Sequence, residues 1–209
     1  MPKKEEPLHT LASFLPEGTF PMVENYLRHY KVHLTITRER ASVLGDYRHA
    51  IHGKNHRISV NGNLNAYAFL ITLLHELAHL LTFDLYGNRV ASHGKEWKQQ
   101  FAVLLKYFLQ SDVFPHDIKH TLEQSLHNPA ASSCADDNLT RVLRSYDTHN
   151  NGLCLVEEIE PGGLFLIRGS RIFKRGEKIR KRYQCLEIKT GRIYLFSPVY
   201  EVLKFNKPD

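Results

Sequence analysis

Residues 65–86, NAYAFLITLLHELAHLLTFDLY, decide the fold because they carry the strongest helical pattern in the chain. Apolar residues occur on most sides of this segment, which predicts a central, buried helix. Gly87 follows at once and supplies a helix-ending residue. Within its most apolar part, Tyr67–Leu81, the side chains of His75, Glu76 and His79 interrupt the apolar pattern. Buried polar groups are costly unless something binds them, so these three side chains need a partner.

The spacing of the two histidines indicates a metal site. His75 and His79 are four residues apart and therefore lie on one face of a helix, where both imidazoles can bind one zinc ion. Glu76 is next to the first histidine and can act as a catalytic base on a water molecule at that ion. Two histidines, a glutamate base and an open position form the zincin arrangement. The alternative is two core histidines with ordinary hydrogen-bond partners and a salt-bridged glutamate.

A third ligand must come from elsewhere in the chain. Thr82 and Leu85 stand where the metzincin spacing requires Gly and His, which excludes that class. His93 is the favoured third ligand, at the start of a second long helix expected from about Ser92 to Leu109. Glu96, one helical turn later, is the alternative. The other histidines are interpreted as ordinary loop residues, although one of the first three could touch substrate: His49, His52, His56, His116, His120, His127 and His149.

The rest of the first 150 residues predicts a mixed fold. Alternating apolar residues predict strands near 32–36, 43–47 and 57–60. Shorter helices are expected near 20–30, 115–126 and 137–146, and residues 1–18 are interpreted as a loose, proline-containing arm. The predicted fold class is therefore α+β: a zincin-like core of a small antiparallel sheet plus helices, with the HExxH motif on the central helix. An extended substrate would lie along a sheet edge, with the 56–60 strand as the candidate.

The character of the sequence changes near residue 150, which predicts domains at 1–150 and 151–209. In the second domain, short apolar segments alternate with glycine-containing turns, as in a small antiparallel β module. This part holds 12 Lys and Arg against 7 Asp and Glu. Eight of the basic residues lie in 168–182, which indicates a polyanionic partner. The candidate nucleic-acid contacts are Arg171, Lys174, Arg175, Lys178, Arg180, Lys181 and Arg182.

Phe173 and Tyr183 are expected to stack on unpaired bases beside these basic residues. The alternative is a solvated hairpin whose apolar residues point inward. Salt-dependent contacts with phosphates would give affinity for single-stranded or duplex DNA without sequence preference.

Composition excludes several other classes of protein. The chain is 42% hydrophobic and 24% charged, which is ordinary for a globular protein and excludes wholesale disorder. The N-terminus lacks the apolar stretch of a secretory signal, and polar residues interrupt the most apolar segment, so no membrane partner is expected. Three widely spaced cysteines, Cys134, Cys154 and Cys185, argue against a disulfide framework and favour a cytoplasmic location.

The motif residues together resemble the SprT-like family, which includes the eukaryotic Spartan proteases. The matching stretches are His75-Glu-Leu-Ala-His79, Ser92-His-Gly-Lys-Glu-Trp97, Leu44-Gly-Asp-Tyr47 and His56-Arg-Ile-Ser-Val60. The resemblance covers roughly residues 18–125 in detail. It implies His75, His79 and His93 as ligands of one zinc ion and Glu76 as the catalytic base. It also implies proteolysis of DNA-associated or DNA-crosslinked proteins. A cytoplasmic protein whose basic module binds DNA would be associated with the nucleoid.

The C-terminal module is similar to the terminal ribbon of the same family, through Tyr183-Gln-Cys-Leu186 and Gly191-Arg-Ile-Tyr-Leu-Phe196. Paired cysteines hold zinc in the ribbon of several members. This module has only Cys154 and Cys185, so no ribbon zinc is expected.

Three functions therefore compete. The first is a zinc-dependent endopeptidase with a DNA-tethering tail. The second is a nucleic-acid-binding module on a zincin scaffold with negligible protease activity. The third is a metal-dependent hydrolase of non-peptide substrates. For the peptidase, Tyr47 and Tyr86 both have the chemistry to stabilise an oxyanion, and the sequence does not choose between them.

Overall fold

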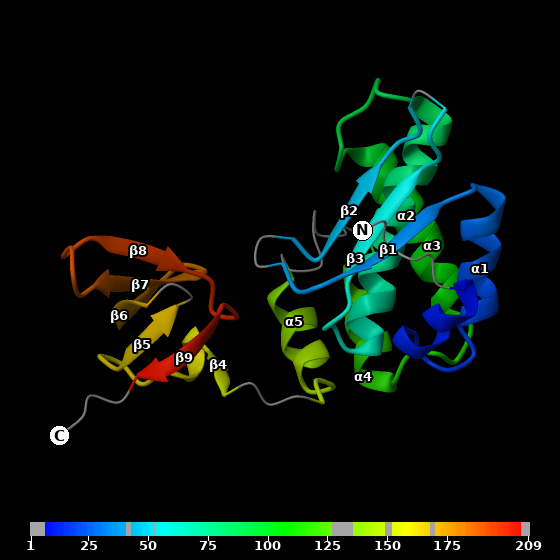
Figure 1. Cartoon of the computed structure of the whole chain (residues 1–209). Helices are drawn as coiled ribbons and strands as arrows, with labels where there is room; N and C mark the ends of the chain where they lie inside the picture. Colours follow the sequence, from blue (N-terminus) through cyan, green and yellow to red (C-terminus); the bar gives the residue numbers. More distant parts are fainter. Residues whose placement is uncertain are drawn as a thin grey trace. The chain divides into compact units, whose positions relative to one another are not determined.

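The computed structural model describes residues 7–40, 43–51, 53–126, 136–148, 152–167 and 170–205 (Figure 1). The chain divides into two compact units, Met1–Asp147 and Thr148–Asp209, where the sequence analysis placed a boundary near residue 150. Four residues discussed above, His52, His127, Cys134 and His149, lie outside the described residues, as does Arg168 of the basic stretch.

The N-terminal domain contains a sheet of three strands in the order β1-β3-β2. The strands are β1 (His33–Thr37), β2 (Gly45–Arg48) and β3 (Arg57–Asn61). β2 pairs antiparallel with β3, but β1 pairs parallel with β3. The prediction of an antiparallel sheet was therefore wrong for β1. The long connection between β1 and β3 includes β2, so the chain can return and run in the same direction as β1.

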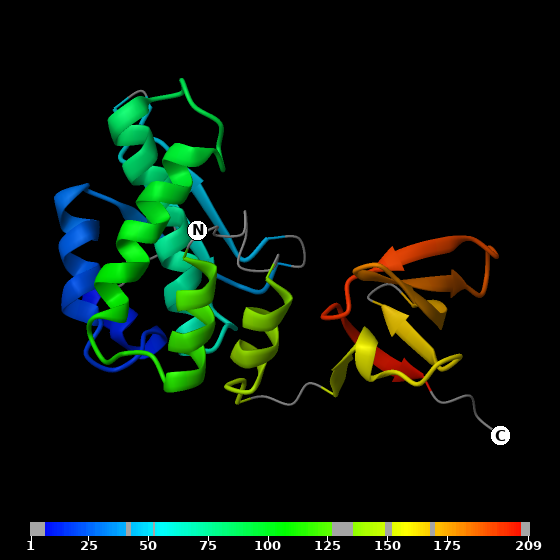
Figure 2. The same ribbon diagram turned by 180° about the vertical axis from the view of Figure 1, so that it is seen from behind.

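Helices pack on one face of this sheet, in front of it when the domain is seen from behind (Figure 2). The helical elements are η1 (Leu8–Phe14), α1 (Phe20–His29), α2 (Ala66–Tyr86), α3 (Lys95–Leu109), α4 (His116–Ser125) and α5 (Asp137–Arg144). The prediction of a loose arm was wrong for the described residues 7–18. Leu11 and Leu15 are buried there, and the Phe14 ring lies 5.5 Å from that of Phe69 on α2.

Helix α2 forms the centre of the domain core. Twelve of its residues are buried, and it packs against α3, β2 and β3. Asn65 begins the helix, since its side-chain oxygen accepts a hydrogen bond from the Ala68 N–H at 2.9 Å. By length and mean hydropathy α2 would suffice for a membrane span, but 78% of that window is buried inside the domain. Burial by protein on most sides explains its apolar character, as expected of a core helix.

The C-terminal module is a sheet of six strands in the order β4-β9-β5-β6-β7-β8, with antiparallel neighbours throughout. Its elements are β4 (Leu153–Leu155), η3 (Val156–Glu158), β5 (Leu164–Ile167), β6 (Arg171–Ile179), β7 (Arg182–Glu187), β8 (Ile193–Phe196) and β9 (Glu201–Phe205). Five of these strands coincide with the short apolar segments expected from the sequence, at 153–156, 164–167, 183–188, 193–196 and 199–203. Strand β6 was not among them, because its charged residues mask the alternation around Phe173.

Candidate metal centre

Three imidazoles meet at one point of the N-terminal domain. His75 and His79 come from α2, one helical turn apart, and His93 comes from the turn that precedes α3. The His75 Nε2 atom lies 3.2 Å from the Nε2 atom of His79 and 3.2 Å from that of His93. Among the described residues, no other group of three or more metal-ligating side chains comes together. These three histidines can therefore hold a metal ion.

The nitrogen spacing fits zinc. Zn–N bonds of about 2.0–2.1 Å at tetrahedral angles would separate two ligand nitrogens by about 3.3–3.4 Å. The two printed separations of 3.2 Å are close to this value, and all three donor atoms lie within 4.8 Å of one another. Three neutral imidazoles leave one tetrahedral position open, as in catalytic zinc sites. Imidazole also binds other first-row metal ions, so the donor set alone does not select zinc.

Burial keeps these histidines ready to bind a cation. Burial, with the neighbouring imidazoles adding, lowers the pKa of His75 to about 3 and that of His79 to about 4. Burial also lowers the pKa of His93. The protein therefore presents uncharged nitrogens at neutral pH, which is the form that binds a metal.

The Trp97 ring, on α3, packs against the imidazole rings of all three histidines. Its ring centre lies 4.7 Å from that of His75, 5.4 Å from that of His79 and 4.8 Å from that of His93. Trp97 is fully buried and is the single tryptophan of the chain. Intrinsic tryptophan fluorescence therefore reports directly on this centre. The sequence analysis did not identify this contact of Trp97 with all three rings.

Glu76 faces strand β2. A Cβ atom built on Gly45 would lie only 2.5 Å from Glu76 Oε1 and 2.9 Å from Thr72 Cγ2. The missing side chain at position 45 therefore makes room for the carboxylate. Burial, with the Asp46 carboxylate adding and Arg40 opposing, raises the pKa of Glu76 to about 8. A nearby cation would favour the ionised form.

Hydrogen bonds of the Asn61 side chain, here called the polar clasp, hold the segment that leads into β2. The buried Asn61 side-chain oxygen accepts hydrogen bonds from Thr37 Oγ1 at 3.0 Å and Arg40 Nε at 2.8 Å. Its amide group donates to the backbone oxygens of Arg40 and Val43. This clasp fixes the approach of Gly45 to α2. Sequence analysis did not identify this hydrogen-bond network, since the partners of Asn61 are distant in the chain.

Strand β2 also brings Tyr47 to the metal centre. The Tyr47 ring is nearly parallel to that of His79, with ring centres 6.4 Å apart. Its hydroxyl lies 2.9 Å from His56 Nδ1, which also accepts the Ala50 N–H at 3.3 Å. Burial, with the Asp84 charge adding, raises the pKa of Tyr47, and burial lowers the pKa of His56. His56 is therefore part of this site, and not the ordinary loop residue expected from sequence.

Of the two candidate third ligands, His93 joins the other two histidines and Glu96 does not. His93 lies in a turn closed by the Gly94 N–H and the Ala91 oxygen, and α3 begins only at Lys95. The expected helix start near Ser92 was therefore about three residues too early. Glu96 does not join the three-histidine group, and its carboxylate lies 3.8 Å from the Lys95 ammonium. The other described histidines that were expected in loops do not join the group either. His49 stacks on Phe83. The expectation of a loop was wrong for His116 and His120, which lie on α4 and stack on each other.

The sheet order changes where a substrate strand can bind. β3 lies between β1 and β2, so both of its edges are already hydrogen-bonded. The prediction that the 56–60 strand would receive the substrate was therefore wrong. β2 is the edge strand beside α2, and within the described residues it pairs only with β3.

Comparison with known protein families gives one match. Residues 22–120 match the SprT-like family. The N-terminal domain is therefore similar to that family over this segment. The match includes β1–β3, α2 and α3, hence every residue of the candidate metal centre. The SprT-like match and the three histidines together indicate a zinc metallopeptidase-like domain. No curated protein and no solved structure matches the chain. The C-terminal module lies outside the SprT-like segment.

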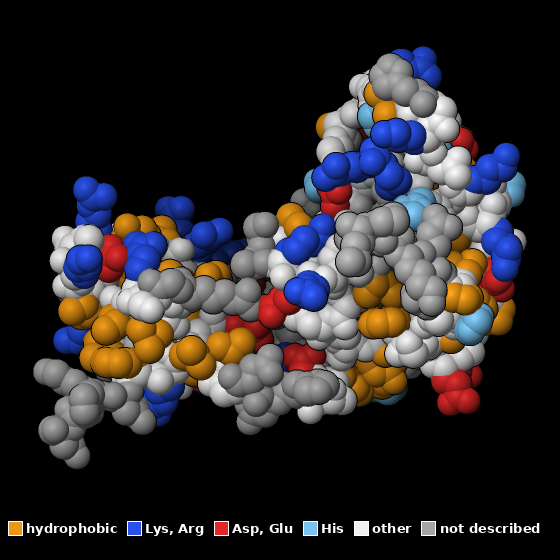
Figure 3. Space-filling view, in the orientation of Figure 1, with side chains coloured by type: hydrophobic (Ala, Val, Ile, Leu, Met, Phe, Trp, Pro, Cys, Tyr) orange, Lys and Arg blue, Asp and Glu red, His pale blue; other side chains and the backbone are white. Residues whose placement is uncertain are grey.

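Two of the seven candidate nucleic-acid contacts also form contacts within the module, although the Arg171 side chain remains exposed. Arg171 Nε donates to Glu187 Oε1 at 2.7 Å, and its guanidinium lies over the Tyr194 ring. Arg175 Nη1 donates to the Ile159 oxygen at 2.6 Å. The other five contribute exposed side chains, on β6 and around the β6–β7 turn: Lys174, Lys178, Arg180, Lys181 and Arg182. Figure 3 shows Lys and Arg side chains gathered toward one end of the visible face of this module.

Base stacking by Phe173 and Tyr183 is contradicted by their burial. Phe173 is fully buried, and Tyr183 is 8% exposed, both in the core of the C-terminal module. The Arg175 guanidinium lies 4.1 Å from the Tyr183 ring centre and covers it further. These aromatic rings stabilise the module and are not free to stack on bases.

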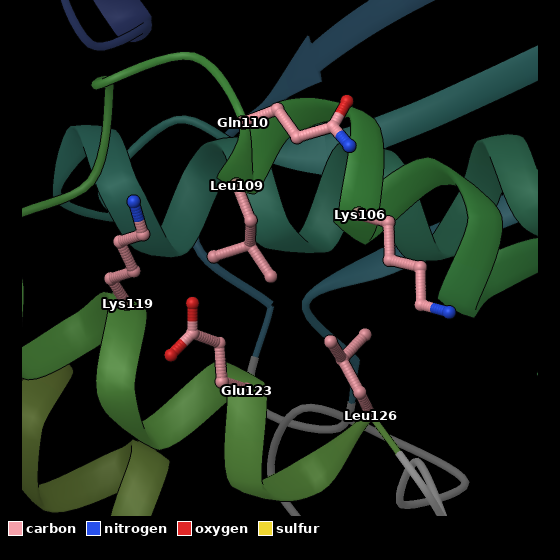
Figure 4. A pocket seen from close by; sticks show the side chains of 6 residues that line it. All are labelled: Lys106, Leu109, Gln110, Lys119, Glu123 and Leu126. Atoms are coloured by element: carbon pink, nitrogen blue, oxygen red, sulfur yellow. The ribbon is translucent and has the colours of Figure 1, made fainter.

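A hollow between α3 and α4 is separate from the metal centre (Figure 4). It is lined by Lys106, Leu109, Gln110, Lys119, Glu123 and Leu126. It contains none of the three histidines and a single carboxylate, so we assign it no catalytic role.

Proposed function

We propose that the N-terminal domain is a zinc-dependent endopeptidase in which Glu76 is the catalytic base. The observation that carries this proposal is the meeting of three Nε2 atoms beside an edge strand, with a buried carboxylate from the same helix. His75, His79 and His93 would hold the ion. The fourth tetrahedral position would remain for chemistry, as in other catalytic zinc sites.

The substrate would be an extended peptide paired with β2. Main-chain hydrogen bonds to an edge strand hold a peptide with little regard to its side chains. This mode of binding suits an enzyme that accepts many proteins. Because Gly45 of β2 faces Glu76, a peptide bound along this edge passes close to the carboxylate.

In the proposed peptide hydrolysis, the zinc ion and the Glu76 carboxylate have different roles. Zinc, when bound, supplies a Lewis acid for the scissile carbonyl and acidifies water. The Glu76 carboxylate takes a proton from the attacking water and delivers it to the nitrogen of the leaving amine. Glu76 is suited to this exchange because its buried position keeps its affinity for a proton high. The positive charge of the site would keep the carboxylate ionised before the reaction.

We also propose that the C-terminal module binds DNA and brings the peptidase to DNA-associated or DNA-crosslinked proteins. The support is the five exposed basic side chains on and around the β6–β7 hairpin. They would contact phosphates and give salt-dependent affinity for single-stranded or duplex DNA. The same observation favours the second candidate function, a DNA-binding protein with negligible protease activity.

The test compares Glu76→Gln with the unchanged protein in a casein-degradation assay, with and without DNA, and with chelator followed by zinc. Cleavage by the unchanged protein should require zinc, and Glu76→Gln should retain zinc but lose cleavage by at least about 100-fold. Glu96→Gln is the matched control and should cleave normally. Full activity in Glu76→Gln would refute the peptidase mechanism. DNA binding without any zinc-dependent cleavage would leave the second function.

A further inference from the structure

The hydrogen bonds around Tyr47 determine the direction of its hydroxyl proton. A backbone N–H can only donate, so the Ala50 N–H requires His56 Nδ1 to be an unprotonated acceptor. The Tyr47 hydroxyl, 2.9 Å from the same nitrogen, must then be the donor. Tyr47 is therefore a protonated phenol whose hydrogen points to His56 in the resting enzyme.

Tyr47 and Gly45 share one face of β2, because residues two apart in a strand point the same way. Gly45 faces Glu76, and Tyr47 stacks on His79. The step from Gly45 to Tyr47 along the strand is about 6.6 Å. The step from Glu76 to His79 along the helix is about 4.5 Å. β2 and α2 therefore lie side by side, with Glu76 facing Gly45 and His79 facing Tyr47. Tyr47 thus lies next to the point where a bound peptide would react.

We propose that Tyr47 is a further catalytic residue, whose hydroxyl donates a hydrogen bond to the carbonyl oxygen of the scissile peptide as negative charge develops there. This inference rests on the proposed peptidase function. The hydroxyl would turn about its C–O bond from His56 Nδ1 to the substrate oxygen, without movement of the ring. His56 is a positioning residue that holds the phenol until substrate arrives. No bond is made or broken at Tyr47, since it lends a hydrogen bond and keeps its proton.

Tyr86 does not fit this role. It is the last residue of α2, two helical turns beyond His79, and its ring contacts none of the three histidines. Its backbone oxygen accepts from the Arg89 Nε, in the turn that leaves the helix. The structure thus separates two tyrosines that the sequence left equivalent.

The experiment measures kcat and KM of zinc-loaded enzyme on a peptide substrate for Tyr47→Phe, Tyr86→Phe and His56→Leu. Tyr47→Phe keeps the ring on His79 and removes only the hydroxyl, so zinc content should be unchanged. Loss of one preorganised donor should lower kcat by about 100- to 1,000-fold with little change in KM. Tyr86→Phe, the matched control, should behave like the unchanged enzyme. His56→Leu should lose less kcat than Tyr47→Phe, because the donor remains.

A second measurement uses a phosphinic peptide, which imitates the tetrahedral arrangement of the reacting carbonyl. Tyr47→Phe should weaken its binding by about the factor by which kcat/KM falls, and binding of the uncleaved peptide to Glu76→Gln should not change when Tyr47→Phe is added. Normal kcat in Tyr47→Phe, or a greater loss in His56→Leu, would overturn the inference. Both outcomes require an active unchanged enzyme, so they are distinct from failure of the proposed function, in which that enzyme would show no zinc-dependent cleavage.

Discussion

Replacing Gly45 by Ala tests the close approach of β2 to helix α2. The new Cβ would lie 2.5 Å from Glu76 Oε1, 2.8 Å from Glu76 Cγ and 2.9 Å from Thr72 Cγ2. All three distances are shorter than carbon contacts allow, so Glu76 or the strand must move. Gly45 does not have a positive φ, so the strain comes from these contacts and not from the backbone.

The size of the effect follows from this displacement. Inserting a methyl group into a packed interior typically costs about 1–3 kcal/mol of unfolding free energy. A catalytic group displaced by about 1 Å can lose about 100-fold in rate. We expect Gly45→Ala to cleave peptide at least about 100-fold more slowly while it retains zinc, because the three atoms nearest to the new methyl group belong to Glu76 and Thr72 and not to a histidine.

The assay combines cleavage per bound zinc with urea unfolding. Gly62→Ala is a suitable control, since its Cβ would lie 2.7 Å from Ile36 Cγ2 in the same domain but away from Glu76. It should lose stability by a similar amount and keep its rate per bound zinc. If Gly45→Ala kept both normal stability and normal cleavage, the described packing of Glu76 against β2 would be wrong.

Two further predictions concern metal and DNA. In Glu76→Gln, zinc affinity measured by Trp97 fluorescence should fall less than about tenfold from pH 7.5 to 5.5, because His75 and His79 have pKa values of about 3 and 4. Three histidines with ordinary pKa values near 6.5 would lose about 1,000-fold over that range, and such a loss would contradict the burial of the site. Replacing residues 180–182 together by Ala should weaken binding of single-stranded DNA and reduce the slope of log K against log salt by about 2. An unchanged slope would show that this turn does not contact phosphates.

The parts of the fold that depend on local pattern could be predicted well. Helix α2 was expected over 65–86 and spans Ala66–Tyr86, because apolar periodicity and the Gly87 break are encoded within the segment itself. The position of His75 and His79 on one face of the helix follows from helix geometry alone. Strand β6 was harder, since a charged strand with one buried residue among nine resembles a solvated turn.

The parts that depend on distant neighbours could not be predicted. Tyr47 and Tyr86 have the same chemistry, and only the position of β2 beside α2 places one of them at His79. Phe173 and Tyr183 lie among basic residues in the chain, yet the pairing of β6 with β7 turns both rings into the module core.

The amino-acid sequence by itself determined the reactive groups: two histidines one turn apart, a glutamate between them and a third histidine after a short connection. These follow from residue identity and helical repeat, which are local. Only the tertiary structure decided that the sheet is mixed, that β2 is the free edge beside Glu76, and that Trp97, Gly45 and Tyr47 surround the centre. The reason is physical: strand order and side-chain contact depend on how the whole core packs, and that free energy is shared among residues far apart in the chain.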